Sequence, residues 1–162
     1  MSRSGYSDDC DQWDLIRWRG AVTSAIRGKR GQQALREIAA ALDALPTQEL
    51  AAESLVTADG EYCTLGALGR ARGLDMSSID PEDREAVART FGIAEALAAE
   101  VMYLNDEGVY EWRYINVEIV GPMRPWEQHA KHVRAPEENV AHRRWRYMRD
   151  WVTKQIRGVP VT

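Results

Sequence analysis

The amino-acid sequence predicts a mainly α-helical fold of about five helices with a small β-hairpin or three-stranded sheet. Three observations lead to this fold class. Apolar residues recur every three or four positions in several segments, Gly or Pro ends most of them, and two segments instead carry β-prone residues. The chain of 162 residues, 44% hydrophobic and 28% charged, has the composition of one globular domain.

The first two helices are predicted from apolar stripes that end at glycine or proline. Residues 9–26 form an amphipathic helix with Ser7 as its N-cap, and Gly28 and Gly31 end it. Its stripe consists of Leu15, Trp18, Val22 and Ile26. A second helix is expected from Gln32 to the residue before Pro46.

The middle of the chain changes period and then returns to helix. Residues 55–64 place Asp59-Gly60 between two short β-prone runs, which is typical of a hairpin. A small-residue helical turn follows at 66–69. Asp80 and Pro81 then predict the start of a helix that ends at Gly92, and apolar spacing predicts another over 93–104.

The last third is expected to hold a strand, an arm and a helix. Residues 109–120 alternate in two phases, so a strand there needs a bulge or break near Tyr114, and it is a candidate third strand for the hairpin. Three prolines predict an irregular arm over 121–136. The final helix, 137–156, is expected to bury Trp145, Met148, Val152 and Ile156. We therefore predict a single domain over 1–162, with the arm as an appendage.

Charge is distributed unevenly along the chain, whose net value is −4. Residues 121–162 hold nine Lys or Arg against four acids, so the preceding 120 residues are strongly acidic. A basic tail folded onto its own acidic body is favoured, and a basic surface for nucleic acid or an acidic partner is the alternative. The acidic start and the absence of a long apolar run predict a cytoplasmic protein with no membrane partner.

The basic turn at 27–31 is the first candidate binding site. Arg27, Lys29 and Arg30 are interleaved with two glycines before a helix start, which suits a phosphate or carboxylate. The turn lacks the spacing of a nucleotide-binding P-loop. A solvated basic turn between two helices would look the same, so both interpretations are open.

A helix-turn-helix-like pattern surrounds Gly92, with small and apolar residues on both sides. The second helix offers Glu95 and Glu100 to a nucleic acid and no basic residue. Because carboxylates repel phosphates, a structural corner is favoured over a recognition helix.

No catalytic, metal or cofactor site is predicted. The histidines His129, His132 and His142 lack a fourth ligand at a matching spacing, and the acids near the N-terminus suit a helix start. Cys10 and Cys63 lie in unrelated contexts and are expected to be reduced thiols. We therefore predict a binding protein that is not an enzyme.

Tryptophan and arginine supply the remaining candidate binding residues. Trp13 and Trp151 lie off the main stripes of their predicted helices and are candidate anchors for a partner. Arg143, Arg146 and Arg149 are expected on exposed faces of the last helix, where they could contact a partner or a nucleic acid.

Several segments resemble a family of small uncharacterised proteins encoded by bacteriophages and prophages. The segments are residues 4–11 (SGYSDDCD), 18–22 (WRGAV), 25–32 (AIRGKRGQ), 41–44, 63–67, 72–76, 91–94, 105–107, 136–137 and 148–152. The resemblance excludes about residues 109–135, a segment that is longer here than is usual in that family. It implies a phage origin and action inside a host bacterium, and it brings no known activity.

Together these patterns predict a phage-encoded accessory protein that binds a macromolecule of the host or the phage. A protein partner is favoured, such as a host defence or replication factor, which makes the chain a candidate inhibitor of host defence. The alternative is a nucleic-acid-binding protein that uses the turn at 27–31 and the arginine-rich last helix. A homo-oligomer is compatible with either hypothesis.

Overall fold

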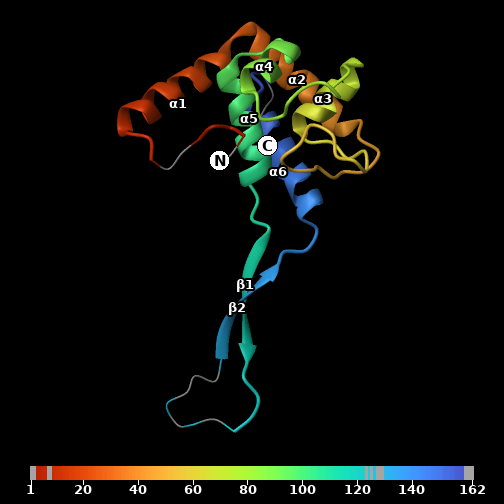
Figure 1. The fold of residues 1–162 in the computed structure, drawn as a ribbon. Coiled ribbons are helices and arrows are strands. Elements are labelled where there is room, and N and C mark those ends of the chain that lie inside the picture. The colour runs from red at the N-terminus through yellow and green to blue at the C-terminus, as the bar shows by residue number, and fades with distance from the viewer. Residues whose placement is uncertain (1–2, 7–8, 123, 125, 127–129, 159–162) are drawn as a thin grey trace. The chain divides into compact units, whose positions relative to one another are not determined.

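Six helices and two strands make up the part of the chain that the structure describes. In this computed structural model that part comprises residues 3–6, 9–122, 124, 126 and 130–158. The elements in chain order are α1 (Gln12–Arg27), α2 (Lys29–Asp43), α3 (Thr64–Arg72), α4 (Arg84–Phe91), α5 (Glu95–Glu107), β1 (Trp112–Glu118), β2 (Ala130–Pro136) and α6 (Val140–Gln155) (Figure 1). The protein is thus mainly α-helical with one small antiparallel sheet, and the described helices number six where about five were predicted.

The chain divides into two compact units. The helical unit comprises residues 1–109 and 141–162, and the hairpin unit comprises residues 110–140. Because the structure gives each unit by itself, the single domain expected over 1–162 stays a prediction.

The core of the helical unit is built around α2. Eight of its 15 residues are buried, and the side chains of Leu35, Ile38 and Leu42 are fully shielded from solvent. Leu68 of α3 and Leu97 of α5 are equally buried in the same core. Burial of each such side chain contributes about 1.5–3 kcal/mol to folding, so α2 is a large source of apolar stabilisation in this unit.

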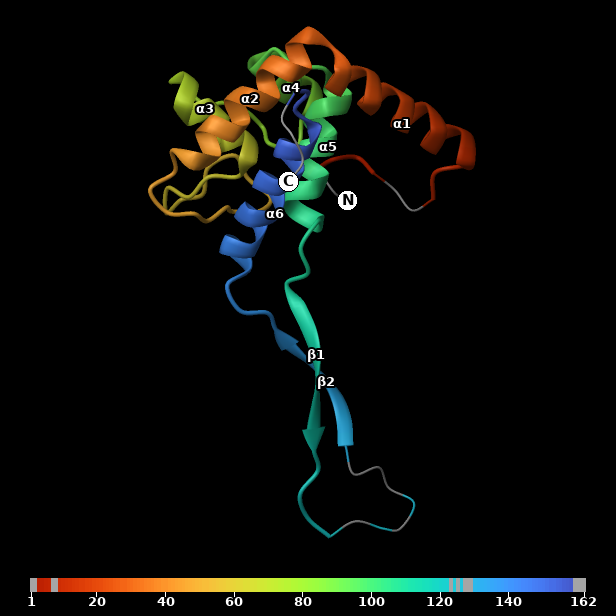
Figure 2. The same ribbon diagram turned by 180° about the vertical axis from the view of Figure 1, so that it is seen from behind.

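The helix predicted over 9–26 exists, but its apolar stripe is only partly buried, because Leu15 is exposed and Trp18 and Ile26 are half-buried. Val22 is the only residue of α1 that is buried, whereas Leu15 is 46% exposed. The N-terminal half of α1 reaches beyond α5 in both ribbon views (Figures 1 and 2). The spacing therefore predicted which residues share a face, but no described element covers that face near the N-terminus.

The starts of two helices differ from the prediction. The N-cap of α1 is Asp11, whose side chain accepts a hydrogen bond from the Asp14 amide at 2.8 Å, and the expected cap Ser7 lies outside the described residues. The N-cap of α4 is Asp83 and not Asp80. Asp80 instead accepts from the Glu82 amide at 2.9 Å, so its side chain closes a turn before the helix.

A single residue, Gly28, joins α1 to α2, and α2 begins at Lys29 instead of Gln32. Gly31 lies inside the first turn of α2. A Cβ atom there would lie 1.9 Å from the backbone oxygen of Ala25, so only glycine allows the two helices to approach this closely. The glycines of the predicted turn therefore bring α1 and α2 together, and the cations between them belong to α2.

The predicted hairpin at 55–64 is reduced to one antiparallel bridge, between Val56 and Tyr62. Directly after it, α3 begins at Thr64, which makes the expected turn at 66–69 a full helix. The predicted corner between two helices is present, since Gly92 ends α4 in the left-handed conformation.

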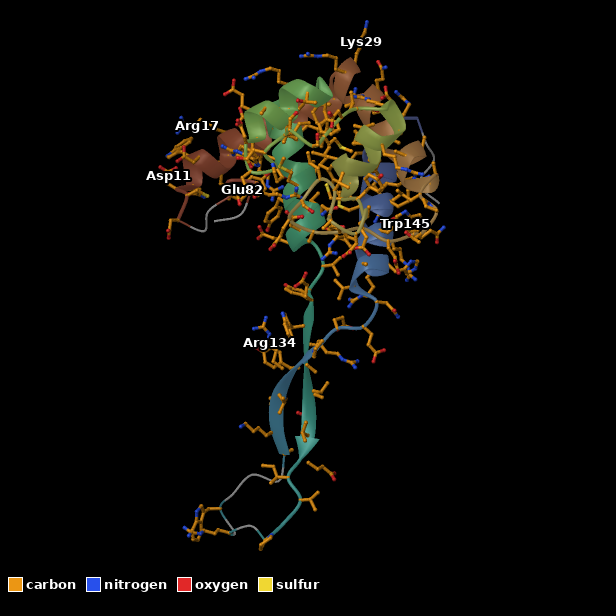
Figure 3. The ribbon with its side chains drawn as sticks, turned by 45° about the vertical axis from the view of Figure 1, so that its right-hand side comes forward. Asp11, Arg17, Lys29, Glu82, Arg134 and Trp145 are labelled. Carbon is orange, nitrogen blue, oxygen red and sulfur yellow. The ribbon has the colours of Figure 1, made fainter. Side chains whose placement is uncertain are left out.

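The predicted core stripe of α6 is confirmed at its centre. Met148 and Val152 are fully buried, and Trp145 and Ile156 are partly buried against the same core. The indole of Trp145 donates a hydrogen bond to the backbone oxygen of Leu42 at 2.9 Å, which attaches α6 to α2 (Figure 3).

The hairpin unit corrects three predictions about 109–136. β1 runs without a break from Trp112 to Glu118, it pairs with β2, and β2 occupies residues that were expected to be irregular. Ile115 lies opposite Val133 in the antiparallel register. Every residue of β1 is exposed. Its aromatic residues, Trp112 and Tyr114, therefore occupy one exposed face and its aliphatic residues, Ile115 and Val117, occupy the other. No bulge is required.

Candidate functional site

The basic residues predicted at 27–31 lie at the α1–α2 corner of the helical unit. Arg27 and Lys29 line a shallow hollow of about 650 Å³ together with Arg36 and Arg157. Arg30 is exposed in the first turn of α2 but does not line the hollow. In Figure 3, Lys29 projects from the end of the helical unit into solvent.

A second shallow hollow, of about 640 Å³, adjoins the first. It is lined by Arg19, Thr23 and Ser24 on α1, and Arg27 lines both hollows. We call the cations of the two hollows the basic strip. Its members are Arg19, Arg27, Lys29, Arg36 and Arg157. The sequence pattern indicated Arg27 and Lys29 but not the others, because Arg19 and Arg36 lie within helices outside the turn and Arg157 lies far away in the sequence.

The buried side chain of Gln32 fixes the arrangement of the basic strip. Its amide nitrogen donates to the backbone oxygens of Ile26 and Gln155, both at 2.9 Å. Its oxygen accepts from the Arg157 amide at 2.8 Å. One side chain therefore links the end of α1, the start of α2 and the residues that follow α6.

The arginines predicted as a binding face on α6 do not form one set. Arg143 and Arg146 are exposed. Arg149 is half-buried and binds Asp43 through two hydrogen bonds of 2.7 Å, and this carboxylate raises the pKa of the guanidinium. Arg144, in the same helix, is buried and donates to the backbone oxygen of Leu50 at 2.8 Å. Arg149 thus joins the basic tail to the acidic body and is not open to a partner.

The two tryptophans predicted as anchors lie in different environments. Trp13 is 71% exposed on α1, close to the exposed Ile16. Trp151 is partly buried against the core of the helical unit. Trp13 is therefore the more exposed of the two, and its role as an anchor for a partner stays a prediction.

The hairpin unit presents two exposed faces of different chemistry. Cross-strand pairs share a face, so one face carries Trp112 and Tyr114 with Arg134 opposite Tyr114. The guanidinium of Arg134 lies 4.5 Å from the centre of the Trp112 ring, and Tyr114 is 75% exposed. The other face carries Ile115 and Val117, with Val133 opposite Ile115. We call these the aromatic face and the aliphatic face.

A crevice of about 740 Å³ lies beside the N-terminal segment of the helical unit and is lined by Tyr6, Trp18 and Tyr103. The Tyr6 hydroxyl donates to the buried carboxylate of Glu100 and accepts from the indole of Trp18. Burial and the Glu100 carboxylate raise the pKa of Tyr6 well above its ordinary value. The network has internal partners for its polar groups, so we assign it a structural role in fixing residues 3–6.

Within residues 3–6, 9–122, 124, 126 and 130–158, no group of three His, Cys, Asp or Glu is placed to hold a metal ion. His132 is exposed on β2, His142 contacts the backbone oxygen of Gln48, and His129 lies outside the described residues. Cys10 is exposed and Cys63 is buried, and both are free thiols. None of the described helices combines the length and apolar character needed to cross a bilayer.

Comparisons of the chain with protein-family models, with curated proteins and with solved structures find no match. The resemblance to phage-encoded proteins is therefore still an expectation. The function proposed below rests on the side chains of the chain itself.

Proposed function

We propose that this chain is a phage-encoded accessory protein that acts in the cytoplasm of an infected bacterium by binding a host or phage protein through its hairpin unit. The observation that carries the proposal is the exposure of aromatic and aliphatic side chains on both faces of the β1–β2 pair. A host defence or replication factor is the expected type of partner, and binding without catalysis is part of the proposal.

The physical argument begins with the stability of a two-stranded sheet. An isolated hairpin is marginally stable in water, and apolar residues on both of its faces gain nothing from solvent. Ile115 and Val117 on one face, and Trp112 and Tyr114 on the other, would become buried if a partner covered the strands. Aromatic residues and Arg are also the residue types that most often dominate the energy of protein interfaces.

The charge of the hairpin unit favours protein over nucleic acid as its ligand. Residues 110–140 contain four Lys or Arg and five Asp or Glu, a net charge of −1. Binding to a phosphate backbone needs an excess of cations, because it is driven by the release of counterions. The strands themselves carry Arg113, Lys131 and Arg134 against Glu118. A protein surface with an apolar patch and nearby carboxylates complements this pattern.

Site-specific photo-crosslinking inside infected cells tests the proposal. A photoreactive residue at position 114, on the aromatic face, should give a covalent adduct with one defined protein. The same residue at Asp59, an exposed position of the helical unit, serves as the control and should not give that adduct. Changing Ile115 and Val117 to Ser should abolish the adduct at position 114 if both faces are engaged.

Quantitative binding measurements with the purified partner then test whether the hairpin unit binds a protein. The interaction should be insensitive to nuclease and only weakly dependent on salt, since most of the contact area is apolar. Adducts at position 114 with nucleic acid alone, or with a second copy of this chain alone, would overturn the proposal. Equal binding by the Ile115→Ser, Val117→Ser variant would exclude the aliphatic face of the hairpin from the interface.

A further inference from the structure

The basic strip gathers cations from three separate segments onto one side of the α1–α2 corner. Arg19 and Arg27 come from α1, Lys29 and Arg36 from α2, and Arg157 from the residues after α6. The two hollows share Arg27, so the strip is continuous. Both hollows are shallow, which suits an extended ligand better than a small molecule that needs enclosure.

The charge of the strip is largely uncompensated. The one acid lining it is Glu37, which accepts a hydrogen bond from Arg72 at 2.7 Å, and this contact lowers the pKa of Glu37. Among the described residues, no carboxylate lies within 4.0 Å of the charged groups of Arg27, Lys29 or Arg36. Arg19 is 3.5 Å from Glu100 but its side chain remains largely exposed.

The electrostatics of α2 give an independent argument for an anionic ligand. The first turn of α2 contains Lys29 and Arg30 and no acid. Cations at this end of a helix oppose its dipole and cost a few tenths of a kcal/mol or more each. The negative end of the α1 dipole, at Arg27, offsets part of this cost, and an anion bound across the strip would offset more of it.

The strip is also held in place before any ligand arrives. Gln32 links the three segments through hydrogen bonds to Ile26, Gln155 and Arg157. Gly31 permits the close approach of α1 and α2 that sets the spacing of Arg27 and Lys29. Preorganised cations lose less entropy on binding than cations on a mobile loop.

From these observations we infer that the basic strip binds the phosphodiester backbone of nucleic acid without reading its sequence. The ligand follows from the geometry, because two adjoining shallow hollows lined by cations match a row of phosphates. No aromatic side chain lines either hollow, so base stacking is not part of the interaction. The inference does not depend on the hairpin unit, which has a net negative charge and for which a protein partner is proposed.

The test is a fluorescence anisotropy titration of a labelled mixed-sequence DNA duplex with the full chain at several salt concentrations. With five phosphate contacts, the logarithm of the affinity should fall with the logarithm of salt with a slope of about −4. Replacing Arg27, Lys29 and Arg36 by Gln should weaken binding about 30-fold or more and make the slope shallower by about 3. All three side chains are exposed, so the melting temperature should hardly change.

A matched control removes three positive charges elsewhere in the helical unit. Arg17→Gln, Arg70→Gln and Arg89→Gln should leave the affinity within about threefold of the wild type, because these exposed cations lie outside both hollows. If the first triple variant proves unstable, Lys29→Gln alone should still reduce the slope by about 1.

Four results would overturn the inference. They are a wild-type chain that does not bind the duplex, a triple variant with an unchanged slope, a control variant that loses affinity equally, and displacement of the duplex by inorganic phosphate beyond the effect of ionic strength. The last result would indicate a compact anion site. None of these outcomes bears on the hairpin, whose partner is tested by crosslinking.

Discussion

In the helical unit, α2 places Leu35, Ile38 and Leu42 where water cannot reach them, whereas in the hairpin unit every residue of β1 is exposed. Both segments are rich in apolar side chains. The difference lies in what each segment packs against, since α2 packs among other helices, whereas β1 pairs with β2 in a two-stranded sheet. An apolar pattern therefore becomes a core in one unit and a candidate interface in the other.

The comparison also separates two kinds of tryptophan, and these give the largest expected effect. Trp145 is partly buried and bonded to Leu42, so Trp145→Ala should lower the free energy of unfolding by about 3 kcal/mol. Trp112→Ala in the hairpin unit should cost no more than about 1 kcal/mol, mainly through loss of its contact with Arg134. Guanidinium unfolding followed by circular dichroism measures both. Equal losses in the free energy of unfolding would contradict the distinction between core and interface.

A matched pair of valines sharpens the same distinction. Val87 of α4 is fully buried, and Val87→Ala should cost about 2 kcal/mol through lost burial and the cavity that remains. Val117 of β1 is 42% exposed, and Val117→Ala should cost less than about 0.5 kcal/mol. The substitution removes the same atoms at both sites, so the ratio of the two losses reports only on the surroundings.

The parts of the fold that the sequence predicted correctly are those governed by local spacing. The stripe through Met148 and Val152 and the turn at Gly92 need no knowledge of distant residues. Residues 130–136 were assigned to an irregular arm because nearby prolines favour loops, and only Pro136 lies in the strand, at its last position. The pairing of β2 with β1 depends on a partner that precedes it by many residues.

The surroundings of the candidate site residues show what residue spacing alone can and cannot predict. Arg27 and Lys29 are neighbours in sequence and were found, whereas Arg157 joins them only because Gln32 holds the residues after α6 in place. Conversely, Arg149 was predicted to be exposed to a partner, but the fold places Asp43 beside it. Residue spacing on one helix does not show which charges another helix neutralises.

The arginines of α6 provide a smaller effect that tests this point. Arg149→Ser should lower stability by about 1 kcal/mol or less, because the bond to Asp43 is partly exposed to solvent. Arg146→Ser should leave stability unchanged within error, since its side chain is exposed. Thermal unfolding of the two variants measures the difference. If Arg146→Ser lowered the melting temperature as much as Arg149→Ser does, the ion pair would contribute nothing specific to stability.

The smallest effect concerns alkaline pH and the Tyr6 network of the helical unit. Burial and Glu100 raise the pKa of Tyr6 in the folded chain above its ordinary value of 10.0. The folded state therefore keeps a proton that the unfolded chain releases above pH 10. The stabilisation from this group is fully present below pH 10 and is lost as the pH rises further.

Replacing Tyr6 by Phe isolates this contribution. The variant should be less stable near neutral pH, because Glu100 and the Trp18 indole each lose a hydrogen-bond partner. Above pH 10, however, its melting temperature should fall less steeply than that of the wild type, since one proton-linked loss has been removed. Tyr147, whose pKa burial also raises, retains its hydroxyl in both proteins and leaves a residual decline. Parallel curves for the two proteins from pH 8 to pH 11 would show that Tyr6 is not held in its protonated form by the fold.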